Sequence, residues 1–89
     1  MDTMPPVDVI EKLRKSASEV ASVKGIEKLV ARKSGLDLLI DIHVQVDPNM
    51  TVEDSHHVGQ HVRDKIQSEI PNAKNVLVHI EPYHGEKKQ

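Results

Sequence analysis

Cysteine, tryptophan and phenylalanine are absent from the sequence, and Tyr83 is the only tyrosine. Without cysteine, disulfides and thiolate zinc sites are excluded, and nothing indicates an oxidising compartment. Without large aromatic side chains, a core must be built from isoleucine, leucine and valine. In a chain of 89 residues such a core is small. This favours a partner subunit or a bound metal as an additional source of stability.

The sequence also lacks an excess of positive charge and any long apolar run. Its formal net charge of -2 argues against a nucleic-acid partner, because such proteins usually present a basic face. No run approaches the roughly 20 apolar residues that span a bilayer. Residues 1–6 have neither the basic start nor the apolar stretch of a signal peptide. These absences predict a soluble chain that stays in the cytoplasm.

Motifs of catalysis are missing as well. No serine or threonine lies in a nucleophile motif, and the four glycines are scattered rather than gathered in a phosphate-binding loop. There is no HExxH zinc-protease motif. The sequence therefore predicts a protein that is not an enzyme.

What the sequence does contain is one long stretch of alternating side chains, residues 36–46. The even positions, from Leu36 to Val46, are all apolar, whereas the odd positions are polar apart from Leu39. Because side chains alternate across a strand, this pattern predicts a strand with one buried face and one wet face. The wet face carries His43 among carboxylates and an amide, which a purely structural strand does not need.

The remaining elements follow from periodicity and from turn residues. Helical spacing predicts a helix over about residues 6–22, ended by Gly25, and a second over about 52–69, capped by Thr51. Imperfect alternation predicts a strand over 26–33 with a possible bulge, joined to the long strand by a Ser34-Gly35 turn. A last strand is expected over 75–82.

The predicted order is therefore α-β-β-α-β in one domain, residues 6–83, after a loose lead-in (1–5) and before a polar tail (84–89). Two helices can cover only one face of a three-stranded sheet, so the other face stays open. The fold class is α+β, a two-layer sandwich.

A candidate metal site lies on that open face. His79 and Glu81 are two residues apart on the last strand, so both point the same way, and His43 shares their face if the two strands are neighbours. Neutral imidazole and carboxylate are common ligands of Zn²⁺ and similar ions. Leu39 and Leu77 share this face, which suggests that another subunit partly covers it. A single exposed histidine is more often solvated than ligating, and it is the combination that favours a site.

The other histidines carry weaker signals. His56 flanks the apolar stripe of the second helix and is close enough to the core to reach the sheet edge. His57 and His61 have the i,i+4 spacing that can hold a metal, but they point away from the stripe, so a solvated face is the favoured interpretation. His84 lies in the tail.

Taken in order, these segments resemble the C-terminal cytoplasmic domain of the cation diffusion facilitator family, whose members export divalent metals such as zinc. The resemblance covers about residues 7–83, and its most specific piece is a last strand of the form V-x-V-H-x-E-P. It is carried by the segments 23–29, 32–35, 42–47, 51–56 and 76–82.

The resemblance implies a metallochaperone-like (ferredoxin-like) fold and a V-shaped homodimer that binds metal near the groove between its subunits. Metal binding would draw the two arms together and favour transport through an attached six-helix membrane domain. By position it implies metal-binding roles for His43, His56, His79 and Glu81, and it places Glu27 where some members carry another histidine. His57 and His61 are not part of the pattern.

The main hypothesis is therefore a regulatory, dimerising domain that binds a divalent metal, most simply Zn²⁺. A counterpart of the membrane domain is not found in these 89 residues. The chain is then either a domain excised from a transporter, which its start at the first helix favours, or a stand-alone relative. Two alternatives remain: a free metal carrier acting as a monomer, and a ferredoxin-like interaction module whose histidines bind no metal.

Overall fold

The structure is a computed structural model that describes residues 4–85. It contains the predicted elements in the predicted order: α1 (Val7–Ser18), β1 (Gly25–Ser34), β2 (Asp37–Val46), α2 (Val52–Glu69) and β3 (Ala73–Pro82). Residues 1–3 of the expected lead-in and 86–89 of the expected tail lie outside the described range, whereas Pro5 is already buried.

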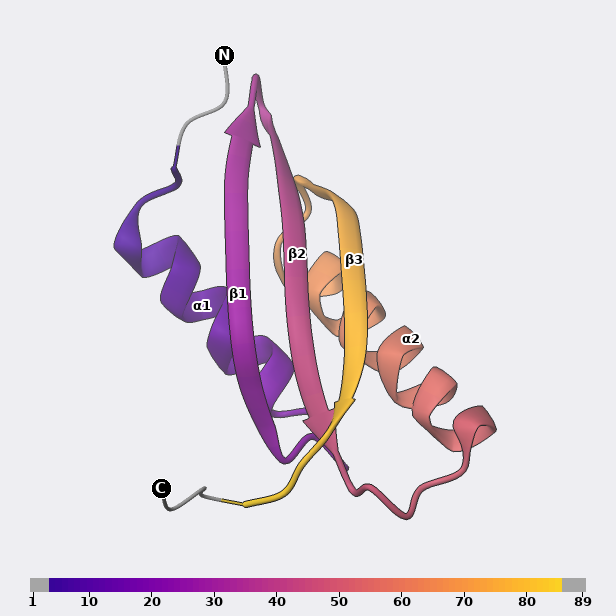
Figure 1. The fold of residues 1–89 in the computed structure, drawn as a ribbon. Helices are drawn as coiled ribbons and strands as arrows, with labels where there is room; N and C mark the ends of the chain where they lie inside the picture. The colour runs from indigo at the N-terminus through magenta and orange to yellow at the C-terminus, as the bar shows by residue number, and fades with distance from the viewer. Residues whose placement is uncertain (1–3, 86–89) are drawn as a thin grey trace.

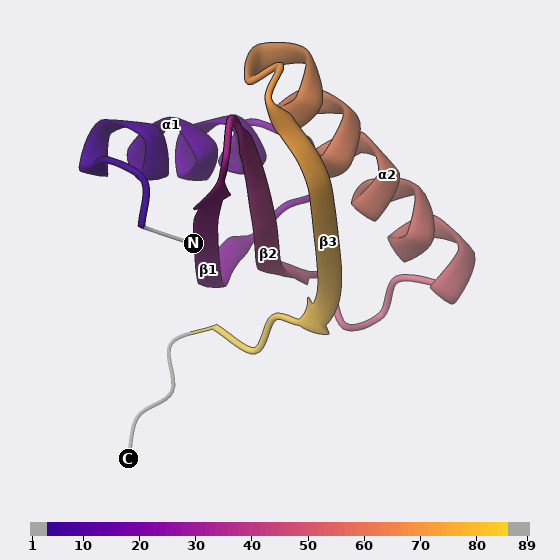
Figure 2. The same ribbon diagram turned by 90° about the horizontal axis from the view of Figure 1, so that it is seen from above.

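The three strands form one sheet in the order β1-β2-β3, with β2 in the centre. β1 and β2 are antiparallel, whereas β2 and β3 are parallel. Both helices lie on the same face of the sheet, α1 behind β1 and α2 behind β3 (Figure 1). Seen from above, no described element covers the opposite face (Figure 2). The two-layer α+β sandwich is confirmed.

The central strand β2 organises the core. Its burial alternates along its whole length, and its inward side chains are at most 3% exposed. Ile42 of β2 contributes to the same core as Leu13 of α1 and Ile66 of α2, and all three are fully buried. Leu36 was expected to begin this buried row, and that prediction is wrong. It lies in the two-residue turn after Ser34 and is 89% exposed.

A bulge interrupts the pairing of β1 with β2. Ile26 pairs with Val44 and Lys28 pairs with His43, so Glu27 is the extra residue on the bulged strand. The imperfect alternation of this strand predicted such an irregularity. A bulge re-aims the side chain of the inserted residue. Here it brings the Glu27 carboxylate to the His43 side of the sheet.

Helix α1 ends at Ser18, four residues before the predicted end. After Ser18 the chain tightens into i,i+3 turns, in which the backbone N–H of Val20 donates to the carbonyl of Ala17. The left-handed residue that reverses the chain is Ser22, with φ of 79°, not Gly25. Gly25 instead begins β1.

Helix α2 has the predicted bounds. The Thr51 hydroxyl caps it by accepting a hydrogen bond from the backbone N–H of Asp54 at 3.0 Å. The buried side chains of α2 include Val62 and Ile66, whereas Val52, its first residue, is 86% exposed.

The two helices are joined by a polar cluster at their contact. The buried Ser16 hydroxyl donates a hydrogen bond to the Glu69 carboxylate. The Lys65 ammonium lies 2.9 Å from the same carboxylate and 3.1 Å from that of Glu19. The cluster ties α1 to α2 independently of the apolar core.

Candidate metal centre

The parallel pairing of β2 with β3 builds the centre. It places His43 directly beside His79, and Gln45 beside Glu81. All four belong to alternate positions whose side chains leave the core, so they emerge on the open face. The two imidazole rings stack, with centroids 4.2 Å apart and planes inclined by 18°. The hypothesis that β2 and β3 are neighbours is confirmed.

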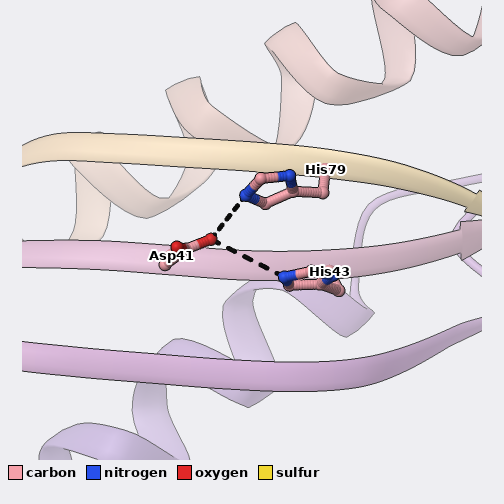
Figure 3. Close-up of side chains that lie close together, drawn as sticks. All are labelled: Asp41, His43 and His79. Atoms are coloured by element: carbon pink, nitrogen blue, oxygen red, sulfur yellow. Dashed lines mark ion pairs between the residues drawn. The ribbon is translucent and has the colours of Figure 1, made fainter.

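A first group of three ligating side chains consists of Asp41, His43 and His79. Asp41 Oδ1 lies 2.6 Å from His79 Nε2 and 3.8 Å from His43 Nε2. Figure 3 shows the three side chains converging above β2 and β3, with the helices behind the sheet. A tetrahedral zinc ion with ligands at about 2.1 Å holds them about 3.4 Å apart, so the 3.8 Å separation is close to that of a coordination sphere, whereas the 2.6 Å contact would have to widen.

The facing atoms of this group are the strongest sign that a cation fits. Asp41 Oδ1 and His79 Nε2 are both shielded from solvent and pair with each other, yet neither makes a hydrogen bond of acceptable geometry among the described residues. Shielded polar atoms without a well-formed hydrogen bond are uncommon in folded proteins. A divalent ion between them would satisfy both atoms at once.

A second group, Glu27, His43 and Glu81, lies on the other side of the His43 ring. His43 Nδ1 is 2.7 Å from Glu81 Oε2 and 3.9 Å from Glu27 Oε1. The bulge of β1 is what gives Glu27 this place. The group opens onto a cleft of about 450 Å³ whose lining also includes Gln45 and His84.

Apolar side chains adjoin the centre on the open face. Leu77 is 58% exposed and Val30 is 42% exposed, and both line a second cleft of about 280 Å³ that reaches Asp41. Leu39 lies in the same cleft and is half-buried. An apolar patch of this kind beside a polar centre is typical of a surface that contacts another protein.

The structure thus brings together four of the five residues expected at the site: Glu27, His43, His79 and Glu81. It also adds Asp41, which the sequence reasoning did not propose as a ligand. The signal was present, because Asp41 is two residues from His43 and therefore on the same face of β2.

His56 is the expected residue that does not join them. It lies exposed on α2, in the helical layer, with its ring 6.2 Å from that of His57. His57 and His61 are also exposed on α2, and neither belongs to a three-ligand group among residues 4–85.

Comparison with known proteins decides the family. Residues 5–83 match the family described as "Cation efflux protein, cytoplasmic domain". The chain belongs to the cation efflux family. The expected resemblance is confirmed, and with it the assignment as a cytoplasmic domain.

Two curated relatives from this family show how much of a whole protein the chain represents. Metal tolerance protein C1 of Arabidopsis thaliana is 35% identical over 82 residues, which are 92% of this chain and 17% of that protein. Magnetosome protein MamB of Magnetospirillum gryphiswaldense is 33% identical over 82 residues, 92% of this chain and 28% of that protein. The chain therefore spans well under a third of either relative. No helix within residues 4–85 is long and apolar enough to cross a membrane.

Solved structures of the cation efflux family share the fold. A variant of the MamM CTD, described as a cadmium form, superposes with a TM-score of 0.85 at 27% identity, covering 88% of this chain and 98% of that one. The predicted metallochaperone-like order α-β-β-α-β is confirmed by this likeness.

Proposed function

We propose that this cation efflux domain is a dimerising metal sensor, which binds one class of divalent ion, most simply Zn²⁺, on the open face of its sheet. The observation that carries this proposal is the shielded pair Asp41 Oδ1 and His79 Nε2, which lie 2.6 Å apart beside the His43 ring without forming a hydrogen bond of acceptable geometry. Neutral imidazole and carboxylate suit zinc and its neighbours. The cadmium form of the MamM CTD supports metal binding on this fold.

The bound ion would supply positive charge that holds side chains of two strands together. The residues of the chain position the ligands. Strands β2 and β3 fix the spacing of His43 and His79, and the stacked rings keep both Nε2 atoms directed at Asp41.

Dimerisation is proposed for the same face. Leu77 and Val30 are exposed beside the ligands, so a second copy that covers them would also enclose the metal centre. If the closed dimer binds the ion more tightly than the open one, the ion shifts the population towards closure. Every tenfold difference in affinity between the two forms is worth about 1.4 kcal/mol. We propose that closure of the dimer acts on the membrane domain of the exporter to which this domain is attached.

His56, which the resemblance offered as a ligand, lies exposed on α2, in the helical layer and away from the open face, so the proposed site does not use it. A His56→Ala variant should therefore bind zinc like the wild type.

The alternative is a monomeric carrier that hands ions to a partner. It uses the same ligands, but it predicts that the protein remains a monomer by light scattering when zinc is added. The exposed apolar side chains beside the centre favour the dimer.

The test is a zinc titration by calorimetry at about pH 7.5, where imidazoles are mostly neutral, with light scattering in parallel. We compare the wild type with His43→Ala/His79→Ala, and use His57→Ala/His61→Ala as the control that removes two exposed histidines of α2. The sensor predicts saturable binding to a dimer, lost in the first variant and kept in the second. Binding that survives the first variant and is lost in the second would place the site on α2 and overturn the proposal.

A further inference from the structure

The sheet has two outer strands, β1 and β3, and side chains of α2 serve the backbone of β3. Arg63 Nε donates to the carbonyl of Val76 at 3.4 Å, and the Gln67 amide donates to the carbonyl of Ala73 at 3.0 Å. An outer strand otherwise presents a row of unpaired N–H and C=O groups, which is a template for a further strand. Helix α2 thus occupies part of this template on β3.

The backbone of β1 has no such cover in the described part of the chain. Among residues 4–85, no side chain hydrogen-bonds to the backbone of residues 26–31. The strand is ten residues long and contains no proline, which would interrupt a row of donors. Because β2 is its only neighbour in the sheet, alternate N–H and C=O groups of β1 point outwards.

An apolar groove runs along this free edge on the helical side of the sheet. Helix α1 crosses behind β1, and its first turn lies beyond the outer edge of the strand (Figures 1 and 2). The groove has a volume of about 410 Å³, and its lining includes Val7 and Ile10 of α1 and Leu29 of β1. Val7 is 73% exposed, and Met4 beside it is 81% exposed. A strand added to β1 would insert every second side chain here.

The free edge is basic, although the whole chain has a net charge of -2. Lys28 lies near one end of the edge, and Arg32 and Lys33 lie near the other. The only acidic residue of the strand, Glu27, is directed towards His43 by the bulge. An added strand with acidic residues at both ends would therefore complement this edge, because opposite charges on neighbouring strands stabilise their pairing.

The same charges disfavour a second copy of β1 as the added strand. Two copies paired antiparallel about Val30 would place Lys28 of one opposite Arg32 of the other. Like charges directly opposite each other are destabilising, and lysine on an outer strand is a common protection against such pairing. The occupant that fits is a strand of different and acidic sequence.

We propose that the edge of β1 binds an extended acidic segment of another protein, which adds a fourth strand to the sheet. Main-chain hydrogen bonds supply affinity in this mode of recognition, and alternate side chains supply specificity. The spacing of β1 sets the pattern of the segment. Acidic residues lie opposite Lys28 and Arg32, an uncharged residue lies opposite Val30, and the two residues between them are apolar and enter the groove beside Leu29.

This surface is separate from the metal centre. An added strand would be the neighbour of β1, and β1 would separate it from His43 on β2 and from His79 on β3. Binding of the segment therefore does not depend on zinc, and its failure would leave the sensor proposal intact.

The first experiment uses a synthetic peptide with blocked ends, Ser-Glu-Val-Thr-Val-Glu-Ser. Its sequence reads the same in both directions, so it matches β1 whichever way the added strand runs. The peptide is titrated into the whole zinc-free chain, isotope-labelled at nitrogen, and NMR follows the backbone amides. We expect saturable binding with shifts centred on β1 and the first turn of α1. Shifts centred on α2 or β3, or no saturable binding at millimolar peptide, would overturn the proposal.

Two modified peptides separate strand pairing from simple charge attraction. One is N-methylated at the threonine and the other at the first valine. Because successive N–H groups of a strand point to opposite sides, only one of the two methyl groups would face β1. One peptide should therefore lose binding and the other should keep it. Equal affinity of the two peptides contradicts strand addition.

The groove is tested by Val7→Asp, with Val52→Asp as its matched control. Each valine is exposed and is the first residue of its helix, where an acidic side chain is favourable. Val7→Asp should weaken peptide binding about tenfold or more, because an apolar contact is lost and a like charge is added. Val52→Asp should bind the peptide like the wild type, and both variants should keep wild-type zinc affinity. Equal peptide affinity in the two variants would exclude the groove.

The charge pattern is tested by Lys28→Glu, with Lys74→Glu, an exposed position at the start of β3, as the control of equal net charge. Only Lys28→Glu should weaken binding. Two further peptides each carry lysine in place of one glutamate, and one of them should bind Lys28→Glu more tightly than the original peptide does. Which one it is gives the direction of the added strand. If neither does so, the proposed pairing is wrong.

Light scattering on the peptide-free chain tests the remaining occupant. The zinc-free protein should have the same oligomeric state in the wild type and in Val7→Asp. A dimer that Val7→Asp dissociates would assign the edge of β1 to a second copy and overturn the proposal.

Discussion

The imidazole rings of His43 and His79 lie face to face, 4.2 Å between centroids, because parallel strands β2 and β3 pair them in register. This stack has two roles that can be separated: packing and ligation. His79→Phe keeps a flat ring for His43 to pack on but removes the nitrogen, whereas His79→Ala removes both. We expect both variants to lose zinc affinity by about 100-fold or more, since even indirect support of a ligand is worth 10–100-fold.

Stability should distinguish the same two variants. The phenylalanine variant should unfold at nearly the wild-type urea concentration, and the alanine variant at a lower one, because only alanine leaves the face of His43 uncovered. Calorimetry measures the affinity and urea unfolding followed by circular dichroism measures the stability. Wild-type zinc affinity in His79→Phe would show that Nε2 of this residue is not a ligand.

Zinc should stabilise the fold, because an ion that binds only the folded chain raises the free energy of unfolding. At a free concentration one hundred times the dissociation constant, the gain is about 2.7 kcal/mol. For a domain of this size, that gain raises Tm by about 10–20 °C. Differential scanning calorimetry with zinc and then with excess chelator checks it, and the rise should be reversed by the chelator. An unchanged Tm at saturating zinc is incompatible with the site.

Acid should weaken the contact between the helices. Hydrogen bonds from Lys65 and then from Ser16 lower the pKa of the Glu69 carboxyl below its ordinary value. Since the folded pKa lies below the unfolded one, this contribution to stability is present above about pH 4.3 and is lost as pH falls through the folded pKa. Lys65, whose pKa is raised chiefly by Glu69 and then by Glu19, stays charged throughout this range.

Glu69→Gln should therefore lower the urea midpoint at about pH 7, with a difference from wild type that shrinks as pH falls well below the ordinary glutamate pKa of about 4.3. Glu11→Gln, on the exposed side of α1, is the matched control. Urea titrations across this range measure both. A difference that stays constant down to the lowest pH would mean that the Glu69 charge contributes nothing.

Much of this architecture could be predicted because it depends on local pattern. The alternation of β2 determines which side chains enter the core, and the cap at Thr51 determines where α2 begins. His79 and Glu81 share a face of β3 by strand geometry alone. Resemblance to the cation efflux family added Glu27 as an expected ligand, which no periodicity indicates, and also His56, which the structure leaves outside both three-ligand groups.

What could not be predicted depends on contacts between distant residues or on backbone energy. The chain reversal after α1 is made by Ser22 in the left-handed conformation, which serine adopts rarely, so the sequence favours Gly25 for this place. Asp41 was overlooked because a carboxylate on a wet face is ordinary until a partner strand is placed beside it. Only the register of β3 brings His79 Nε2 to 2.6 Å from Asp41.

One glycine offers a way to strengthen the domain without touching the centre. Gly59 lies in the interior of α2 and faces β3, and a Cβ there would have its nearest neighbours, atoms of Ile80 and Val78, at 3.6–3.8 Å. Those are ordinary contacts, so alanine fits. Glycine within a helix costs about 1 kcal/mol relative to alanine. Gly59→Ala should therefore raise the free energy of unfolding by about 0.5–1 kcal/mol.

The turn glycine provides the opposite control. Gly35 has φ of +63° with open space around it, so alanine there meets no clash but pays about 1 kcal/mol or more for a left-handed backbone. Gly35→Ala should lower the urea midpoint by as much as Gly59→Ala raises it.

If Gly59→Ala destabilises the fold instead, then β3 cannot shift enough to accept an added methyl group from α2. Because β3 carries His79 and Glu81, zinc affinity should in that case fall with stability, which calorimetry on the same variant would reveal.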